Sequence, residues 1–110
     1  MSLRFRALGE ADQEVDHAAG RYELETPGTG RRFLHAYFEL ISHICQFPRT
    51  GTRLSQYEDP GCEVRSFVLG TVFPYTVFVA LFEDEIVILA VAHQHQEPGY
   101  WAERLTKVER

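Results

Sequence analysis

Two histidines separated by one residue, His93 and His95, are the side chains of this chain best suited to chemistry at neutral pH. They end an apolar, strand-like run in the segment AVAHQHQEPGYW, residues 90–101. Side chains two positions apart on a strand point to the same face, so the imidazoles could serve as acid and base or bind a metal ion. A zinc site needs a further protein ligand, and nothing in the sequence brings the other three histidines close. We therefore expect no metal and no cofactor, and a histidine pair that marks the end of the sheet.

An aromatic pair, Tyr100 and Trp101, follows Pro98 and Gly99 shortly after the histidines. Aromatic side chains in a chain end of this kind pack against a sheet and hold the tail in place. Exposed Tyr and Trp are also favoured anchors for a partner protein. We expect the packing role, with partner contact as the alternative.

Two amphipathic helices are predicted in the first half of the chain. In residues 7–22 the apolar positions recur every three or four residues along one face. After the turn sequence TPGTG, a second helix is expected over residues 30–46. It carries two adjacent apolar rows, one of Phe33, Tyr37, Leu40 and Ile44 and one of Leu34, Phe38, Ile41 and Cys45. This arc is so wide that we expect part of Leu34, Tyr37 or Phe38 to stay exposed, and Cys45 to be buried.

The second half has the period-two pattern of strands. Strands are predicted over residues 3–6, 62–69, 72–82 and 85–93, and a short helix or turn over residues 98–105. Tight connections make the last three strands antiparallel neighbours. The strand 85–93 is apolar on both faces and should lie inside the sheet, with the first strand beside it. The expected fold class is α+β, a helical hairpin packed on a small antiparallel sheet in the order β-α-α-β-β-β, forming a single domain over residues 1–110.

Composition limits the function. The chain has 16 acidic residues against 11 Lys plus Arg, a net charge of −5, which disfavours binding to the phosphates of nucleic acid. We expect no membrane association, because no apolar run reaches the ~20 residues that span a bilayer. Cys45 and Cys62 form no CxxC pair. A reduced, cytoplasmic protein is the simplest interpretation.

Several stretches together resemble one known family. They are ICQFPRTG at residues 44–51, the run FPYTVFVALFEDEIVILAVAH at 73–93, and PGYW at 98–101. With the order of elements, these stretches make residues 3–105 similar to the RelE/ParE toxin superfamily, and most closely to its ParE branch of plasmid-stabilisation toxins. These proteins are the toxins of bacterial type II toxin–antitoxin pairs, so the resemblance implies the same fold and a cognate antitoxin as partner.

The resemblance implies two alternative activities. ParE-like members poison DNA gyrase and have no known catalytic site, whereas RelE-like members cleave mRNA in the ribosome. Carried onto this chain, the nuclease positions are Arg65 and Tyr100, with His93 and His95 as further candidates for proton transfer. A metal-independent endoribonuclease would use these four residues.

The chain departs from the nuclease pattern at several positions. Tyr75 and Gln94 stand where a catalytic arginine is expected. The loop before Arg65 is acidic, with Glu58, Asp59 and Glu63. A sheet poor in cations is unsuited to stabilise the charge that develops on phosphate during cleavage. We therefore expect binding to a protein rather than catalysis. Arginines that converge with Tyr100 in a polar cleft would instead favour the nuclease.

The expected function is that of a growth-inhibiting toxin which binds a protein target such as DNA gyrase and is neutralised by its antitoxin. The alternatives are a ribosome-dependent mRNA endoribonuclease and a non-toxic, decayed binding module. Without the antitoxin the chain should be poorly behaved or a homodimer. The residues expected to contact target or antitoxin are Arg53, Tyr75, Tyr100, Trp101, Tyr37 and Phe38.

Overall fold

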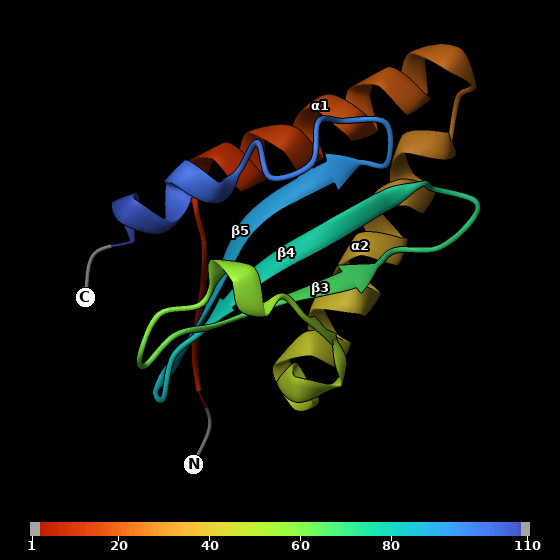
Figure 1. Cartoon of the computed structure of the whole chain (residues 1–110). Helices are drawn as coiled ribbons and strands as arrows, with labels where there is room; N and C mark the ends of the chain where they lie inside the picture. Colours follow the sequence, from red (N-terminus) through yellow and green to blue (C-terminus); the bar gives the residue numbers. More distant parts are fainter. Residues whose placement is uncertain (1–2, 109–110) are drawn as a thin grey trace.

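The chain runs through a strand, two long helices and four further strands, and ends in a 3-10 segment. A computed structural model describes residues 3–108; residues 1, 2, 109 and 110 of the expected domain lie outside it. The regular elements are β1 (Arg4–Ala7), α1 (Gly9–Glu25), α2 (Thr29–Gln46), β2 (Thr52–Arg53), β3 (Glu63–Val68), β4 (Tyr75–Leu81) and β5 (Glu85–His93). Short 3-10 helices span Pro48–Thr50, Ser55–Tyr57 and Ala102–Lys107. Figure 1 shows β5 and β4 at the centre, α1 along one edge and α2 behind the sheet.

The helical hairpin forms because each helix has an apolar stripe and the turn between them is tight. In α1 the buried residues Ala11, Val15 and Ala18 recur at helical spacing. Gly30 begins the buried stripe of α2, and a Cβ on it would lie 2.5 Å from the carbonyl oxygen of Ala19. Only glycine therefore lets the two helices approach this closely.

The sheet has the strand order β1-β5-β4-β3-β2. β2, β3, β4 and β5 are antiparallel neighbours, whereas β1 pairs parallel with β5, with Phe5 opposite Ile86. The antiparallel arrangement expected for the later strands is confirmed, and the parallel edge strand β1 makes the sheet as a whole mixed. Parallel neighbours need a crossover connection, and the hairpin of α1 and α2 with the strands after it supplies one. The expected position of β1 beside β5 is confirmed.

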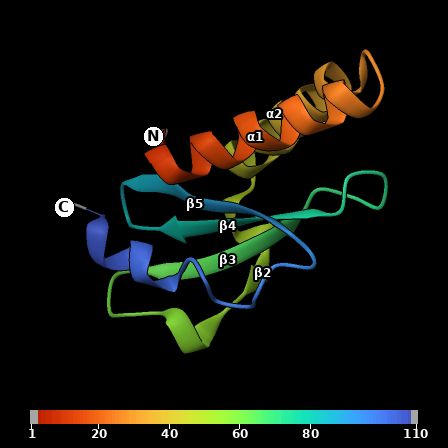
Figure 2. The same ribbon diagram turned by 90° about the horizontal axis from the view of Figure 1, so that it is seen from above.

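Apolar side chains fill both faces of the sheet. One cluster lies between the helices and the sheet and includes Phe33, Tyr37 and Ile88. The other lies on the opposite face, where Trp101 covers Leu89 and Val64. Figure 2 shows the helices on one side of the sheet and the C-terminal segment on the other. This double cover explains why β5 is apolar on both faces.

Of the expectations for α2, the exposure of one residue among Leu34, Tyr37 and Phe38 is confirmed by Phe38, whereas the burial of Cys45 is wrong. Tyr37 is buried, with 4% of its surface exposed, because it lies on the row that faces the core. Cys45 is exposed because its row turns away from the sheet. Phe38, on the same outer row, is 59% exposed, as expected.

Within residues 3–108 no helix is both long and apolar enough to cross a lipid bilayer.

Candidate functional site

A polar cleft lies between α1, the end of the sheet and the C-terminal tail. We call it the helix–tail cleft; it has a volume of about 540 Å³. From α1 it is lined by residues that recur at intervals of three or four, beside the buried stripe. The lining residues are Glu10, Gln13, Glu14, His17, Arg21, Tyr75, Val91, His93, His95, Gln96 and Arg104.

One wall of this cleft is held by the Glu14 cluster, which consists of Glu14, Arg104 and Tyr100. The Arg104 guanidinium donates to both carboxylate oxygens of Glu14 at 3.0 Å, and the Tyr100 hydroxyl donates to Glu14 Oε2 at 2.6 Å. The backbone N–H of Val91 donates to Glu14 Oε1 at 2.9 Å, and Arg104 also donates to the carbonyl of Leu89 at 3.0 Å. The cluster therefore joins α1, β5 and the tail.

The Glu14 cluster leaves Tyr100 and Arg104 poorly suited to catalysis. Burial, together with the hydrogen bond to Glu14 and its negative charge, raises the pKa of Tyr100. The hydrogen bond to Glu14 raises the pKa of Arg104, so its charge is fixed and already paired. An arginine does converge with Tyr100 in a polar cleft, but Glu14 neutralises it.

A second group of side chains, the His93 cluster, lies in the same cleft. It comprises Arg21, Tyr75, His93 and His95. Arg21 Nη2 donates to the Tyr75 hydroxyl at 2.7 Å, and the ring of Tyr75 stands edge-on to that of His93, with centroids 5.2 Å apart. The rings of His93 and His95 are 5.1 Å apart.

The contacts of His93 favour the neutral form of its ring. Its Nδ1 accepts a hydrogen bond of 3.0 Å from the backbone N–H of His95, which leaves the ring proton on Nε2. Burial, and the positive charges of His95 and Arg21, lower the pKa of His93. The chain leaves β5 at His93 and turns, yet the two imidazoles still lie side by side. Among residues 3–108 no group of three His, Cys, Asp or Glu side chains is arranged to hold a metal ion.

Arg65 lies away from the helix–tail cleft. It sits on β3, which β4 separates from β5, so the four nuclease candidates do not converge. Arg65 Nη1 donates to the carbonyls of Arg49 and Gly51 at 3.1 and 2.9 Å, and Nε donates to Glu63 at 3.0 Å. Its side chain is 13% exposed. Arg65 thus anchors the segment after α2 to the sheet.

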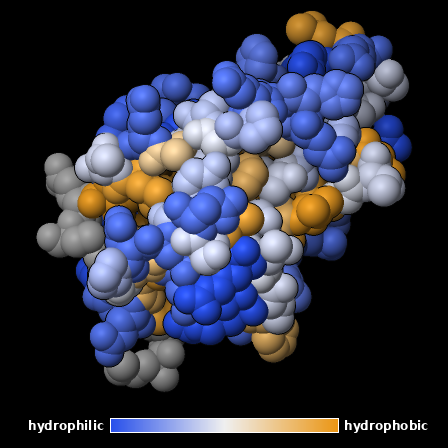
Figure 3. Space-filling model, in the orientation of Figure 1, coloured by the Kyte–Doolittle hydropathy of each residue, from blue (hydrophilic) through white to orange (hydrophobic). Residues whose placement is uncertain are grey.

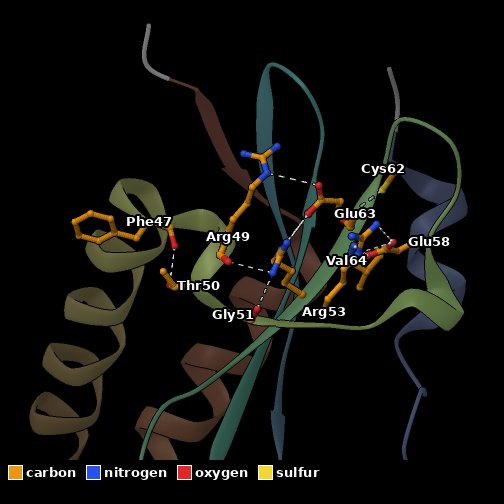
Figure 4. A network of polar contacts seen from close by, with 10 residues as sticks. Phe47, Arg49, Thr50, Gly51, Arg53, Glu58, Cys62, Glu63 and Val64 are labelled. Carbon is orange, nitrogen blue, oxygen red and sulfur yellow. Dashed lines mark hydrogen bonds and ion pairs between the residues drawn. The ribbon is translucent and has the colours of Figure 1, made fainter.

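The surroundings of Arg65 are closed by further ion pairs. Arg49 and Glu63 point toward one another, as do Arg53 and Glu58 (Figure 4). Glu58 also accepts a hydrogen bond from the backbone N–H of Val64. The positive charges on this face are therefore matched by carboxylates from the acidic loop that the sequence indicates.

The aromatic residues expected at a binding surface divide into buried and exposed. Trp101 is 1% exposed and stacks on Phe78, with ring centroids 4.5 Å apart. Its packing role is confirmed, and it can meet a partner only if the tail moves. Burial raises the pKa of Tyr37 to about 12. Phe38 alone of these three side chains is open to a partner.

On the face of the molecule that carries the tail, hydrophobic surface forms separate patches among hydrophilic side chains (Figure 3). The outer row of α2, defined by Leu34, Phe38, Ile41 and Cys45, holds two exposed residues and two half-buried ones. This row is a candidate for contact with an apolar partner segment.

The sequence interpretation missed Glu14, Arg104, Arg21 and His17. The available signal was the spacing of Glu14, His17 and Arg21, which places them on one strip of α1. The pairing of Glu14 with Arg104, 90 positions apart, could not be read from spacing.

Comparisons with known proteins support one fold. No protein-family model matches the chain, and no curated protein sequence matches it significantly. A solved structure described as the chromosomal ParDE TA system from P. aeruginosa matches with a TM-score of 0.67. The match covers 84% of this chain and 96% of that chain, at 19% sequence identity. The helical hairpin on a five-stranded mixed sheet is therefore a ParE-like fold.

Proposed function

We propose that this protein is the toxin of a bacterial type II toxin–antitoxin system. The observation that carries the proposal is the ParE-like fold, shared over 84% of the chain with a member of a ParDE system. Fold alone does not fix function, and the surfaces of this chain bear on the assignment as well. A cognate antitoxin is its partner, and its place of action is the cytoplasm.

The outer row of α2 supports an antitoxin partner. Phe38 is 59% exposed on a helix whose other row packs against the core. Burial of an exposed Phe stabilises a complex by about 1.5–3 kcal/mol. An apolar segment of the antitoxin laid along this row would gain that energy.

The pairing of the arginines supports a protein target, such as DNA gyrase, rather than cleavage of RNA. Arg49, Arg53, Arg65 and Arg104 each have a carboxylate partner within 3.5 Å. Phosphate would have to displace a carboxylate before it could pair with any of these four guanidinium groups. With a net charge of −5, the chain as a whole also repels a polyanion.

A ribosome-dependent mRNA endoribonuclease is the second candidate. The observation that favours it is the helix–tail cleft, where His93, His95, Arg21 and Tyr75 lie together. Such a nuclease would not use Arg65, which is engaged with Glu63 and two backbone carbonyls.

Induced expression in a bacterial host, with and without the adjacent open reading frame, tests both candidates. We expect growth arrest that the neighbouring product relieves. Accumulation of cleaved DNA–gyrase complexes would support the protein target, and new mRNA 5′ ends in primer extension would support the nuclease instead. Growth that is unaffected without any antitoxin would contradict the toxin assignment and favour a non-toxic binding module.

A further inference from the structure

The two acidic residues that line the helix–tail cleft, Glu10 and Glu14, already have hydrogen-bond and ion-pair partners. Each oxygen of Glu14 accepts two hydrogen bonds, shared among Arg104, Tyr100 and the Val91 N–H. Glu10 pairs with Lys107 at 3.0 Å. Neither carboxylate is free to neutralise the other positive groups of the cleft.

The His93 cluster, in contrast, has no acidic partner. Arg21 donates to a neutral hydroxyl, that of Tyr75, and within residues 3–108 no carboxylate lies within 4.0 Å of its guanidinium. Two acids follow Arg21 on α1, Glu23 and, one turn away, Glu25. Glu23 accepts hydrogen bonds from the backbone N–H groups of Gly28 and Gly30 instead. Burial lowers the pKa of His93, and the positive charges of His95 and Arg21 lower it further.

The hydrogen-bonding groups of this cluster are donors. The Tyr75 oxygen accepts from Arg21, so its own proton is available to another group. His93 Nδ1 accepts from the backbone, so Nε2–H is likewise available. With the remaining N–H groups of Arg21, these donors match the oxygens of an anion, and a planar carboxylate suits the guanidinium fork.

The surroundings favour a peptide over a nucleic acid as the source of that anion. Glu97 is exposed two residues after His95, and Asp16 is exposed on α1 beside His17. A chain of phosphates would run past these acids, whereas a peptide can present one carboxylate between neutral residues. The volume of about 540 Å³ lies within the range of roughly 300–1,000 Å³ that is usual for ligand sites.

We propose that the helix–tail cleft binds an acidic peptide segment of a partner protein, with Arg21, Tyr75 and His93 holding a glutamate or aspartate carboxylate. The site is separate from the outer row of α2 and does not depend on the toxin assignment. A bound carboxylate stabilises the imidazolium form of His93, so binding strengthens as the pH falls. The charged and titratable groups that face His93 are those of Glu10, Glu14, His17, Arg21, Tyr75, His95 and Arg104.

The test is a titration of the ¹⁵N-labelled chain, followed by NMR, with a blocked alanine peptide that carries a single glutamate at its centre. The control peptide has glutamine in place of glutamate. We expect the glutamate peptide to shift the signals of Arg21, His93 and His95. It should bind more tightly at about pH 6 than at about pH 8. The glutamine peptide should leave these three signals unshifted.

Two variants and a matched control locate the site. Arg21→Ala and Tyr75→Phe should weaken binding of the glutamate peptide, the former by at least about tenfold because a charge-assisted hydrogen bond is lost. Arg31→Ala removes the same charge from an exposed position of α2 and should leave binding unchanged. Thermal melts of each variant establish that it is folded.

Three results would overturn the proposal. They are equal shifts with both peptides, unchanged affinity in Arg21→Ala, or displacement of the glutamate peptide by a single-stranded oligothymidylate that binds the same residues more tightly. The growth assay with the antitoxin tests the proposed function independently, so failure of one is distinct from failure of the other.

Discussion

Replacement of Glu14 by glutamine tests whether the Glu14 cluster stabilises the fold. The carboxylate of Glu14 accepts four hydrogen bonds, from Val91, Tyr100 and twice from Arg104. Glutamine keeps the shape but has one oxygen and no charge. Donors that face the new NH₂ group lose their acceptor, and Arg104, at 15% side-chain exposure, keeps a charge without its counterion.

The expected cost is about 2–3 kcal/mol in the free energy of unfolding. Removal of one partner from a fully buried ion pair costs about 3–5 kcal/mol. Here the side chains of Glu14 and Arg104 are 20% and 15% exposed, so water recovers part of that loss. The predicted cost is correspondingly lower.

Urea unfolding followed by circular dichroism measures the effect. Arg104→Met and the double variant complete a cycle, in which we expect a coupling energy of about 1–3 kcal/mol. Glu10→Gln is the matched control, because it breaks an exposed pair on the same helix and should leave the urea midpoint unchanged. Hydrogen exchange at the Val91 amide should accelerate in Glu14→Gln. A loss below about 0.5 kcal/mol with unchanged Val91 exchange would refute this reasoning.

Three further predictions concern glycine, arginine and histidine. Gly99 has φ of +76° and a Cβ there would lie 2.6 Å from the Tyr57 hydroxyl, so Gly99→Ala should cost about 2–4 kcal/mol, measured by urea unfolding. Gly61→Ala, at φ of +85° but in open space, should cost about 1–2 kcal/mol. Arg65→Met should accelerate amide exchange in residues 48–53 and destabilise the chain by about 1–3 kcal/mol, because the carbonyls it caps lose their donor. Because the pKa of His93 is lowered from 6.5, the unfolded chain protonates there first, so stability should fall as the pH drops below about 6.5, and less in His93→Asn.

Each of these has a contrary outcome. Equal costs at the two glycines would show that the Tyr57 hydroxyl moves aside freely. Uniform exchange rates in Arg65→Met would mean that the segment after α2 is held by other contacts. A pH profile of stability that His93→Asn leaves unchanged would locate the titrating group elsewhere.

Much of the fold was predictable because its elements have strong local patterns. The strand predicted over residues 85–93 matches β5, since a run of Ile and Val bounded by a Glu-Asp turn has one interpretation. The strand predicted over residues 72–82 is shorter in the structure, Tyr75–Leu81. Its apolar side chain made Val72 look like part of the strand. In the structure Val72 lies in the connection before β4, where it is exposed and does not pair with β3.

The direction of β1 and the orientation of α2 were less accessible. Pairing of β1 with β5 was expected, but its parallel sense depends on the path of the whole chain between them. Periodicity showed two apolar rows on α2 without showing which one faces the core. Cys45 was therefore expected in the core although it lies outside it.

The candidate site was predicted only in part. The proximity of His93 and His95 followed from sequence, whereas the role of Arg65 did not, because a guanidinium bonded to backbone carbonyls leaves no mark on residue spacing. The pairing of Glu14 with Arg104 could not be predicted for a related reason. The two side chains meet only because the tail, anchored by Trp101, packs on the sheet and brings Arg104 beside α1.

The Glu14 cluster has a consequence for behaviour at high concentration. β5 extends past Ile88, the last residue that pairs with β1. From Leu89 onward, the edge of β5 away from β4 has no neighbouring strand among residues 3–108. Backbone N–H and C=O groups without a partner on so hydrophobic a strand could pair with a strand of another copy of the chain and so promote aggregation. Here the Val91 N–H and the Leu89 carbonyl are engaged by Glu14 and Arg104. A chain whose tail was clipped would lose Arg104 from this margin and become prone to intermolecular strand pairing.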